Sequence, residues 1–389
     1  MIDLESLLNP EVASIPPSGI RKFFDIAAEM KDAISLGVGE PDFVTPWHIR
    51  EAGIYSLEKG HTYYTSNSGL KELREEISLY QKRRFSLSYD PEQEILVTVG
   101  GSEAIDLMIR SVVAPGDEVL IPEPSFVCYS PCTKLAGGVA VPLITKEEDD
   151  FRLTAEALRA AITDKTKLLI MPFPNNPTGA VMPRESLLEI AEVLRDTNVL
   201  VLSDEIYGEL TYTGKHVSIA EIEGMRERTV VVGGFSKAFA MTGWRLGFAC
   251  GPAPLLSMMR KVHQYAIMCA PTVSQYAAVE AMRHGDDDIE MMKKEYNYRR
   301  RVIVDGFRKM GLSCFEPGGA FYAFPSIKKT GMKSMEFAEK LLNEEKIAVV
   351  PGDAFGASGE GFIRCSYAYS IDNINEALER IGRFVKKYI

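Results

Sequence analysis

The sequence predicts an α/β fold in which helices cover a mostly parallel sheet. Short apolar runs alternate with amphipathic stretches through the middle of the 389-residue chain, the pattern of repeated strand–helix–strand units. The runs KLLIM at 167–171 and VLVL at 199–202 are typical of strands buried on both faces. Ligands of such sheets bind beyond the carboxyl ends of the strands, so the turns that follow the strands are the places to look for chemistry.

The expected elements follow the chain in order. A helix at 183–195 is expected from an apolar stripe of Leu187, Leu188, Ile190, Ala191 and Leu194. A second helix, at 102–113, follows the strand EILVTV at 94–99. Strands are expected at 94–99, 118–121, 138–143, 167–171, 199–202, 229–232 and 246–250.

From residue 286 onward, strands and helices no longer alternate strictly, which predicts a smaller α+β domain. Helices are expected at 286–310, 334–344 and 371–387, and strands at 320–324, 347–350 and 361–366. We therefore expect a large domain at 45–285 and a small domain built from 1–44 and 286–389. Arg299, Arg300 and Arg301 are interpreted as a solvated face of the long charged helix.

Composition and charge exclude several classes of protein. The 44 Lys and Arg against 54 Asp and Glu give a net charge of −10, which argues against a protein that coats nucleic acid or an anionic membrane. The N-terminus lacks the features of a signal peptide, and no apolar stretch approaches the roughly 20 residues that cross a bilayer. The six cysteines have no metal-ligand spacing, so we expect no metal and a reducing, cytoplasmic location.

Two turns carry groups suited to an anion and to a cation. Gly100, Gly101 and Ser102 open a helix whose free N–H groups suit a phosphate, although Gly-Gly-Ser is also an ordinary turn. Asp204 follows the strand VLVL, where a poorly hydrated carboxylate either meets a cationic partner or caps a helix.

Two further turns carry a lysine, an arginine and an amide. Lys237 follows the strand at 229–232, and a desolvated lysine amine is a nucleophile toward a carbonyl. Arg245, eight residues on, has the geometry to hold a phosphate bidentately; the alternative is two surface cations beside a loop. Asn176 lies in NNPTG at 175–179, a rigid turn that is suited to orient a ligand.

Together these segments resemble the class I/II aminotransferases, pyridoxal 5′-phosphate (PLP) enzymes of fold type I, and especially their aspartate and aromatic subgroup. The resemblance extends from LGVGEPDF at 36–43 through NNPTG and SDEIY to GFIRCS at 361–366, and GFSKAFAMTGWRLG at 234–247 matches the family's pattern around its cofactor lysine. It implies a mostly parallel seven-stranded sheet in the large domain. It also implies transfer of an amino group from an L-amino acid to a 2-oxoacid, through a ping-pong cycle between pyridoxal and pyridoxamine phosphate.

The resemblance assigns roles at the cofactor. Lys237 would bind the cofactor aldehyde and then shuttle the proton of the substrate α-carbon. Asp204 would keep the pyridine nitrogen protonated, and Tyr207 and Asn176 would hydrogen-bond the 3-oxygen of the ring. The phosphate would be held by Gly101, Ser102, Glu103, Ser236 and Arg245.

The remaining roles concern the substrate and the assembly. Arg364 would bind the substrate α-carboxylate, assisted by Asn176 and the backbone at Gly39. Tyr64 would reach the phosphate of a neighbouring subunit, which implies a homodimer with shared active sites. Phe126 would stack on the cofactor ring, with plain core packing as the alternative.

Substrate preference is expected to depend on the segment 18–23, which in this family folds back over the site. Ile20 and Phe355 would suit an aromatic or other apolar side chain, whereas Arg21 or Lys22 would serve an acidic one, and no second substrate arginine is assigned. The LLNP opening and the SDEIYGELTY and KVHQY stretches also resemble the subgroup that transaminates N-acetyl-diaminopimelate.

The closest alternative activity is a PLP-dependent carbon–sulfur β-lyase, which uses the same lysine, aspartate and arginines. A regulatory module fused to a DNA-binding segment is disfavoured because the motifs begin near Leu36 and leave no room for a helix-turn-helix domain. A dehydrogenase is disfavoured because the chain lacks a dinucleotide fingerprint.

Overall fold

A seven-stranded sheet forms the centre of the computed structural model, which describes residues 2–17 and 32–389. The strand order is β2-β8-β7-β6-β5-β3-β4, and β8 alone runs antiparallel to its neighbours within this sheet. The bounds are β2 (Ile95–Thr98), β3 (Glu118–Glu123), β4 (Val139–Ile144), β5 (Thr166–Met171), β6 (Leu200–Asp204), β7 (Thr229–Gly234) and β8 (Gly247–Cys250). The predicted α/β class, its mostly parallel sheet and each expected strand of the middle region are thereby confirmed.

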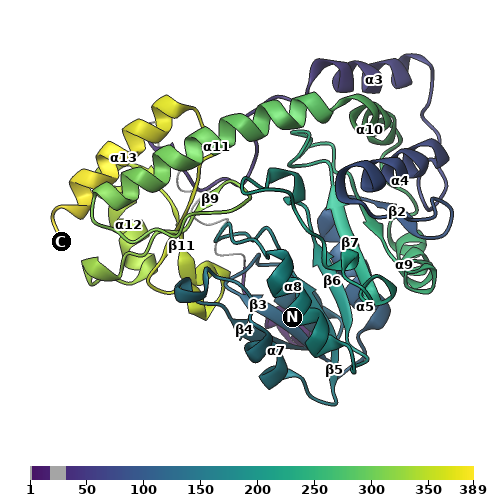
Figure 1. Ribbon diagram of the computed structural model, residues 1–389, viewed down its shortest axis with the longest axis horizontal. Helices are drawn as coiled ribbons and strands as arrows, with labels where there is room; N and C mark the ends of the chain where they lie inside the picture. Colours follow the sequence, from purple (N-terminus) through teal and green to yellow (C-terminus); the bar gives the residue numbers. More distant parts are fainter. Residues whose placement is uncertain (1, 18–31) are drawn as a thin grey trace.

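Helices cover both faces of this sheet (Figure 1), which explains why its central strands are apolar throughout. Leu168 and Ile170 pack with α5, α6 and α9, whereas Leu169 and Met171 pack on the opposite face with α7 and α8. The bounds are α3 (Trp47–Glu58), α4 (Lys71–Phe85), α5 (Gly101–Val112), α6 (Tyr129–Leu135), α7 (Ala155–Ala161), α8 (Arg184–Leu194), α9 (Ala253–Ala266) and α10 (Thr272–His284). Alternate residues of one strand therefore fill two separate cores.

A second, smaller body holds two short sheets and three long helices. One sheet has the order β11-β12-β9 and the other pairs β1 with β10 in parallel. The bounds are β1 (Ile34–Ser35), β9 (Tyr322–Ala323), β10 (Ile347–Ala348), β11 (Val350–Pro351), β12 (Ile363–Ser366), α11 (Asp286–Lys309), α12 (Ser334–Glu345) and α13 (Ile371–Val385). The single strand expected at 347–350 is two strands, because the chain leaves β1 after Ala348 and joins β12 at Val350.

Helix α11 runs from the large body across to the small one (Figure 1). The small body has its own core, in which Tyr296 and Phe307 of α11 pack with Phe337 and Phe384. On this basis we propose to keep the division into 45–285 and 1–44 plus 286–389.

The basic cluster of α11 is not a solvated face. Arg299 and Arg300 are only 6% and 7% exposed, whereas Arg301 is exposed as expected. Acidic groups explain the burial, since Arg299 pairs with Asp42 and Arg300 with Glu316. The prediction was wrong for two of the three arginines because pairing across elements cannot be read from one helix.

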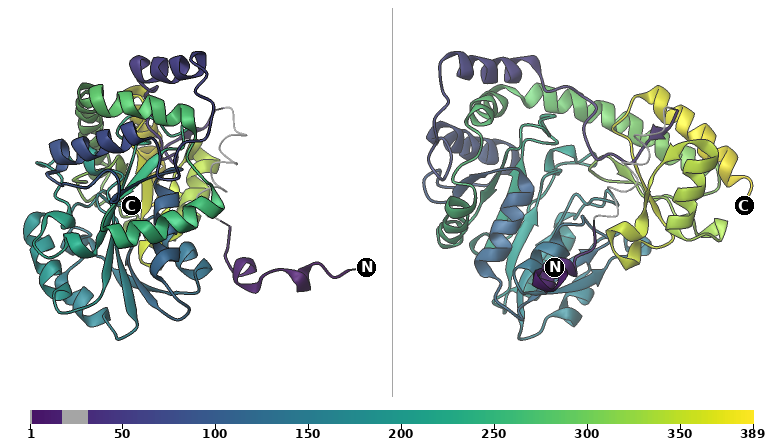
Figure 2. Two further views of the ribbon diagram at one scale, coloured as in Figure 1. Left: turned by 90° about the vertical axis from the view of Figure 1, so that its right-hand side faces the viewer. Right: turned by 180° about the vertical axis from the view of Figure 1, so that it is seen from behind.

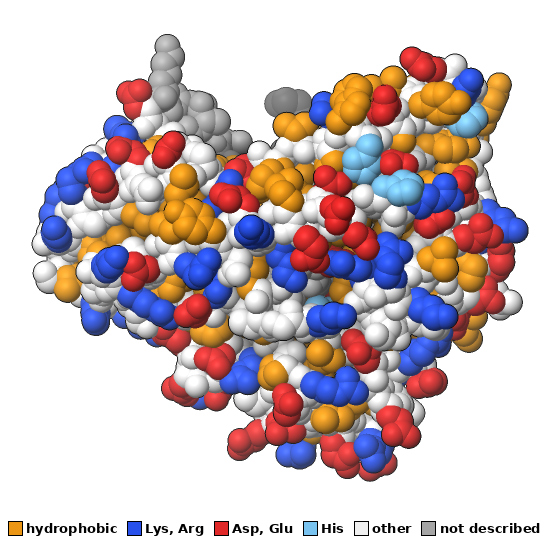
Figure 3. Space-filling model, turned by 45° about the horizontal axis from the view of Figure 1, so that its top comes forward, with side chains coloured by type: hydrophobic (Ala, Val, Ile, Leu, Met, Phe, Trp, Pro, Cys, Tyr) orange, Lys and Arg blue, Asp and Glu red, His pale blue; other side chains and the backbone are white. Residues whose placement is uncertain are grey.

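The segment 2–17 projects from the rest of the chain (Figure 2) and contains η1 (Glu5–Leu7) and α1 (Pro10–Ala13). Its apolar side chains are largely exposed, among them Leu4, Leu7 and Leu8. Elsewhere acidic and basic side chains intermingle on the surface, as the face in Figure 3 shows. Within residues 2–17 and 32–389, no helix is long and apolar enough to cross a membrane, and no cluster of three or more metal-ligating side chains occurs.

Candidate active site

A cavity of about 890 Å³ opens beyond the carboxyl ends of the parallel strands. It lies where β2, β5, β6 and β7 end, the place that this class of sheet reserves for ligands. Most of the predicted site residues line it together: Gly39, Gly101, Ser102, Phe126, Asn176, Asp204, Tyr207, Ser236, Lys237, Arg245 and Arg364. Residues from eight separate parts of the sequence thus meet in one cavity because the strands end at one edge.

Lys237 lies at this cavity on the turn after β7. Its Nζ donates a hydrogen bond to the carbonyl oxygen of Gly39 at 2.6 Å. Burial lowers the pKa of the Lys237 amine to about 8, and the charges of Arg364 and Arg245 act in the same direction, while Glu40 opposes them. The amine is therefore much closer to its neutral, nucleophilic form at neutral pH than an ordinary lysine is.

Asp204 ends β6 and is buried without a cationic partner among the described residues. Its Oδ2 accepts from the hydroxyl of Tyr129 at 2.7 Å and its Oδ1 from the backbone N–H of Ile206 at 3.2 Å. Burial raises the pKa of the Asp204 carboxyl, and these hydrogen bonds lower it. Such a carboxylate is stabilised by a cation placed in the cavity beside it.

Arg364 is a buried cation that lines the cavity. Its Nη1 donates to Asn176 Oδ1 at 2.8 Å and its Nη2 to the carbonyl oxygen of Gly37, while its Nε has no partner among the residues that the structure describes. The guanidinium lies 4.5 Å from the ring centre of Tyr322 and 4.8 Å from that of Phe355. Because no carboxylate of the described chain neutralises it, Arg364 is suited to bind one from a ligand.

Two tyrosine hydroxyls meet next to this arginine. Tyr207 and Tyr322 are hydrogen-bonded at 2.7 Å between their hydroxyl oxygens, and both line the cavity. Burial raises the pKa of both phenols. They therefore stay protonated at neutral pH and serve as hydrogen-bond donors.

The N-terminus of α5 forms a cradle for an anion. The helix begins at Gly101 without a capping side chain, so its first N–H groups remain available. The turn packs closely against β8, since a Cβ on Gly247 would lie only 2.6 Å from the carbonyl carbon of Gly100. Ser102, Ser236 and Arg245 line the same end of the site.

The side chain of Glu103 does not face this cradle. Its Oε1 contacts the Nδ1 of buried His263 at 2.6 Å, and its Oε2 accepts from the backbone N–H of Val99. The carboxylate is thus turned toward α9, and only the backbone amide of Glu103 remains available to a phosphate.

The other predicted residues divide into three groups. Phe126 both faces the cavity and packs edge-on against Tyr129, with ring centres 6.1 Å apart. Phe355 is buried behind Arg364 rather than lining the cavity, and Tyr64 is 80% exposed and outside it. Ile20 lies outside the described residues, as do Arg21 and Lys22.

Among the residues that line the cavity and that sequence reasoning missed, three have ionisable side chains: Glu40, Tyr129 and Tyr322. Tyr129 belongs to the same EPSFVCY segment as Phe126, so its position beside the Phe126 ring could have been predicted from the sequence. Tyr322 gave no such signal, because it comes from β9 of the small body.

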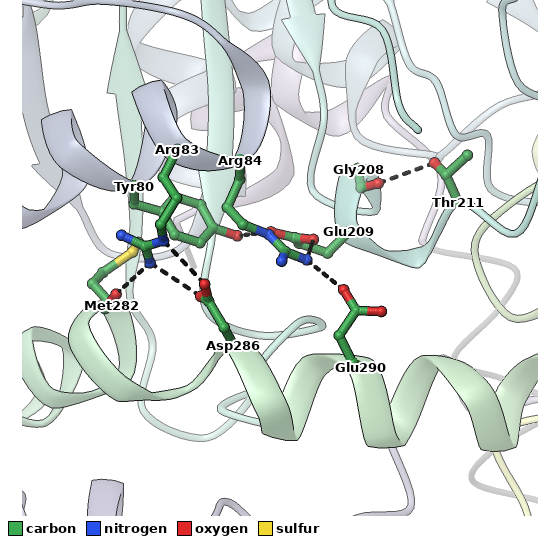
Figure 4. A network of polar contacts seen from close by, with 9 residues as sticks. All are labelled: Tyr80, Arg83, Arg84, Gly208, Glu209, Thr211, Met282, Asp286 and Glu290. Atoms are coloured by element: carbon green, nitrogen blue, oxygen red, sulfur yellow. Dashed lines mark hydrogen bonds and ion pairs between the residues drawn. The ribbon is translucent and has the colours of Figure 1, made fainter. Parts of the chain in front are cut away.

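A polar network supports the turn that carries Tyr207 (Figure 4). Buried Glu209, two residues later, accepts hydrogen bonds from Tyr80 and from Arg84, the latter at 2.8 and 2.6 Å. Arg84 also donates to Glu290 of α11 at 2.8 Å. The network joins α4, the Tyr207 turn and α11, so the helix that connects the two bodies is held to the wall of the cavity.

The fold and the cavity bring together a desolvated lysine, a buried aspartate and a buried arginine, groups that suit a PLP-dependent transferase. The family model "Aminotransferase class I and II" matches residues 31–381. The chain therefore belongs to the class I and II aminotransferases and is a PLP-dependent aminotransferase, which uses amino acid and 2-oxoacid substrates.

Individual relatives agree with this family. The putative aminotransferase YugH of Bacillus subtilis is 57% identical over 99% of this chain and 100% of its own. An aspartate aminotransferase of Pyrococcus abyssi is 47% identical over 96% of this chain and 97% of its own. The solved structure of an aromatic aminotransferase from Pyrococcus horikoshii is 44% identical, with a TM-score of 0.90 over 95% of this chain and 99% of its own.

The residues present fit PLP. Asp204 is buried at the cavity and pairs with no cation of residues 2–17 and 32–389, which suits a protonated pyridine nitrogen. The uncapped start of α5 and Arg245 suit the phosphate, and Lys237 suits the aldehyde. Each charged group of the cofactor thus meets a complementary group of the protein.

Proposed function

We propose that this aminotransferase takes its amino group from aspartate, an aromatic L-amino acid or a related donor and passes it to a 2-oxoacid. The observation that carries the proposal is the joint placement of Lys237, Asp204 and Arg364 around one cavity. When bound, the cofactor supplies an electron sink for the substrate α-carbon.

We assign the following roles to the chain's own residues. Lys237 holds the cofactor and then moves the proton of the substrate α-carbon, for which its pKa of about 8 is well matched. Arg364 binds the α-carboxylate, oriented by Asn176. Tyr207 donates to the 3-oxygen of the cofactor, and the backbone at Gly39 borders the substrate.

The described lining supports an apolar or aromatic side chain. Lys237, Arg245 and Arg364 are the cations that line the cavity within the described ranges, and each already has a role. Val38, Ile105 and Phe126 add apolar surface to the walls, although a cation from residues 18–31 would favour an acidic side chain instead.

We further propose a homodimer with shared active sites, working in the cytoplasm. Tyr64 is 80% exposed and lies outside the cavity of its own chain, as a residue that reaches into a neighbour's site would. Helix α3 exposes several large hydrophobic side chains, among them Trp47, Ile54 and Tyr55. Such a patch is typical of an interface.

The test is a panel of amino donors against 2-oxoglutarate, scored for the oxoacid formed from each donor. The panel contains L-aspartate, L-phenylalanine, L-tyrosine and N-acetyl-LL-diaminopimelate, with the Lys237→Ala variant as the matched control. We expect L-aspartate or an aromatic donor to give the highest kcat/KM and the control to give no turnover.

Other outcomes of the panel point elsewhere. A marked preference for N-acetyl-LL-diaminopimelate would replace the proposed donors, while leaving the reaction type unchanged. Pyruvate and ammonia from cysteine conjugates, without amino transfer to 2-oxoglutarate, would indicate a carbon–sulfur β-lyase. Undiminished turnover of the Lys237→Ala variant would overturn the assigned role of the lysine.

A further inference from the structure

We propose that Arg299 is a positioning residue that holds the segment 37–42 in place over the active site. The segment carries two carbonyl oxygens that contact Arg364 and Lys237, and Arg299 ties its far end to α11. The inference rests on the proposed function, since it assigns these two partners to substrate and cofactor.

The segment crosses from the small body to the large one. On the small side, Leu36 is anchored by backbone hydrogen bonds with Ala348 and Ser366. On the large side, Thr45 donates to the carbonyl oxygen of Ala240 at 2.6 Å and accepts from Trp244 at 3.1 Å. Between these anchors, the chain passes along the mouth of the cavity without regular secondary structure.

Two backbone carbonyl oxygens of this segment accept hydrogen bonds from the side chains of Arg364 and Lys237. The carbonyl oxygen of Gly37 accepts from Arg364 Nη2, and that of Gly39 accepts from Lys237 Nζ at 2.6 Å. The fit around Gly39 is close, because a Cβ there would lie 2.4 Å from the hydroxyl of Tyr322. A displacement of the segment therefore changes the surroundings of the arginine and of the lysine together.

Arg299 is the buried cation that contacts the far end of the segment, at Asp42. Its Nη1 donates to both carboxylate oxygens of Asp42 at 2.8 Å, and its Nε donates to Glu295 at 2.9 Å. The guanidinium also lies 5.5 Å from the ring centre of Phe43, which packs edge-on against Tyr296. Charge, hydrogen bonding and ring packing thus hold Asp42 and Phe43 against α11.

Arg300 provides a matched control on the same helix. It is buried to the same extent but donates to Glu316 and to the carbonyl oxygen of Pro317, outside the segment 37–42. Loss of either arginine removes a buried cation from α11, so both losses lower stability. A positioning role of Arg299 predicts an additional effect that Arg300 does not share.

The experiment compares the Arg299→Gln, Arg299→Lys and Arg300→Gln variants with the wild type. The measurements are the KM of the best amino donor and of 2-oxoglutarate, kcat, and the pH midpoint of the visible absorption of the bound cofactor. For Arg299→Gln we expect both KM values to rise about tenfold or more, kcat to fall less than threefold, and the pH midpoint to move. Arg299→Lys keeps one charged donor for Asp42, so its two KM values are expected to lie between those of Arg299→Gln and the wild type.

Arg300→Gln is expected to lower the melting temperature while both KM values stay within twofold of wild type. The inference is overturned if Arg299→Gln also lowers only the melting temperature, with KM values and pH midpoint unchanged. Should Arg299→Gln fail to fold, Asp42→Asn, which alters the partly exposed partner, is expected to raise both KM values in the same way. Unchanged KM values in Asp42→Asn would also overturn the positioning role of Arg299.

A cofactor-free readout separates this inference from the proposed function. Trace acetylation of the apoenzyme, followed by mass spectrometry, reports the reactivity of Lys237 alone. Arg299→Gln is expected to change that reactivity, and Arg300→Gln is not. A wild type that neither binds PLP nor transfers amino groups would refute the proposed function, whereas an unchanged Lys237 reactivity in Arg299→Gln would refute the positioning role.

Discussion

The lowered pKa of Lys237 makes a quantitative prediction about the apoenzyme. Burial takes the pKa from the ordinary value of 10.5 to about 8. Each pKa unit corresponds to 1.36 kcal/mol, so the ammonium form is destabilised by about 3 kcal/mol. At pH 7 roughly one molecule in ten then carries a neutral amine at this position, against roughly one in three thousand for an ordinary lysine.

Competitive acetylation of the apoenzyme between pH 6 and pH 11 measures the pKa of the Lys237 amine directly. The modified peptides are quantified by mass spectrometry, with the exposed Lys71 as an internal reference. The reactivity of Lys237 is expected to rise with pH around a midpoint near 8, because only the neutral amine reacts.

The charge of Glu40, which raises the pKa of Lys237, provides a second test of the same reasoning. Glu40 favours the ammonium form, so Glu40→Gln is expected to lower the midpoint. An exposed charge pair contributes about 0.2–1 kcal/mol, which corresponds to a decrease of at most about 0.7 pH unit. A midpoint near 10 in the wild type, or a higher midpoint in Glu40→Gln, would refute the reasoning.

The remaining predictions concern the aspartate, the substrate arginine and the polar network. Asp204→Asn is expected to lower kcat at least about a hundredfold, because it removes the buried carboxylate at the cavity. Tyr129→Phe is expected to lower kcat about tenfold, because it removes a hydrogen bond to that carboxylate. Steady-state kinetics at saturating PLP measure both effects. Arg364→Lys is expected to raise KM for amino donor and oxoacid alike by about a hundredfold, since lysine cannot hold a carboxylate bidentately; a rise for one substrate only would contradict the shared role. Glu209→Gln leaves Arg84 without its buried partner and is expected to lower the free energy of unfolding by about 2–4 kcal/mol, measured by urea denaturation; an unchanged midpoint would show that the network is not stabilising.

Much of the large body was predictable because its strands and helices follow from the pattern of apolar residues in short stretches of sequence. Strands such as β5 and β6 are apolar at consecutive positions, since helices cover both faces of the sheet. The residues that end them, including Asp204 and the Lys237 turn, share one edge as a consequence of parallel topology. The small body was less predictable, because its strands are as short as two residues and change partners within a few positions.

The failed expectations have one cause. Arg299 and Arg300 were interpreted as solvated from their positions in the sequence alone. Each side chain instead pairs with an acidic residue outside its own helix, Arg299 with Asp42 and Arg300 with Glu316. Such partners cannot be inferred from helix periodicity or motif spacing.

The sequence by itself predicted the class of fold and the family correctly, because apolar patterning and turn motifs are local properties. It also pointed to the lysine, aspartate and arginines that the folded chain brings to one cavity. The tertiary structure alone decided how these groups are tuned. The burial of Lys237, the hydrogen bond from Tyr129 to Asp204 and the closeness of Tyr322 to Tyr207 all depend on elements that are distant in sequence. Electrostatic interactions depend on distance and on exclusion of water, and both exist only once the chain has folded.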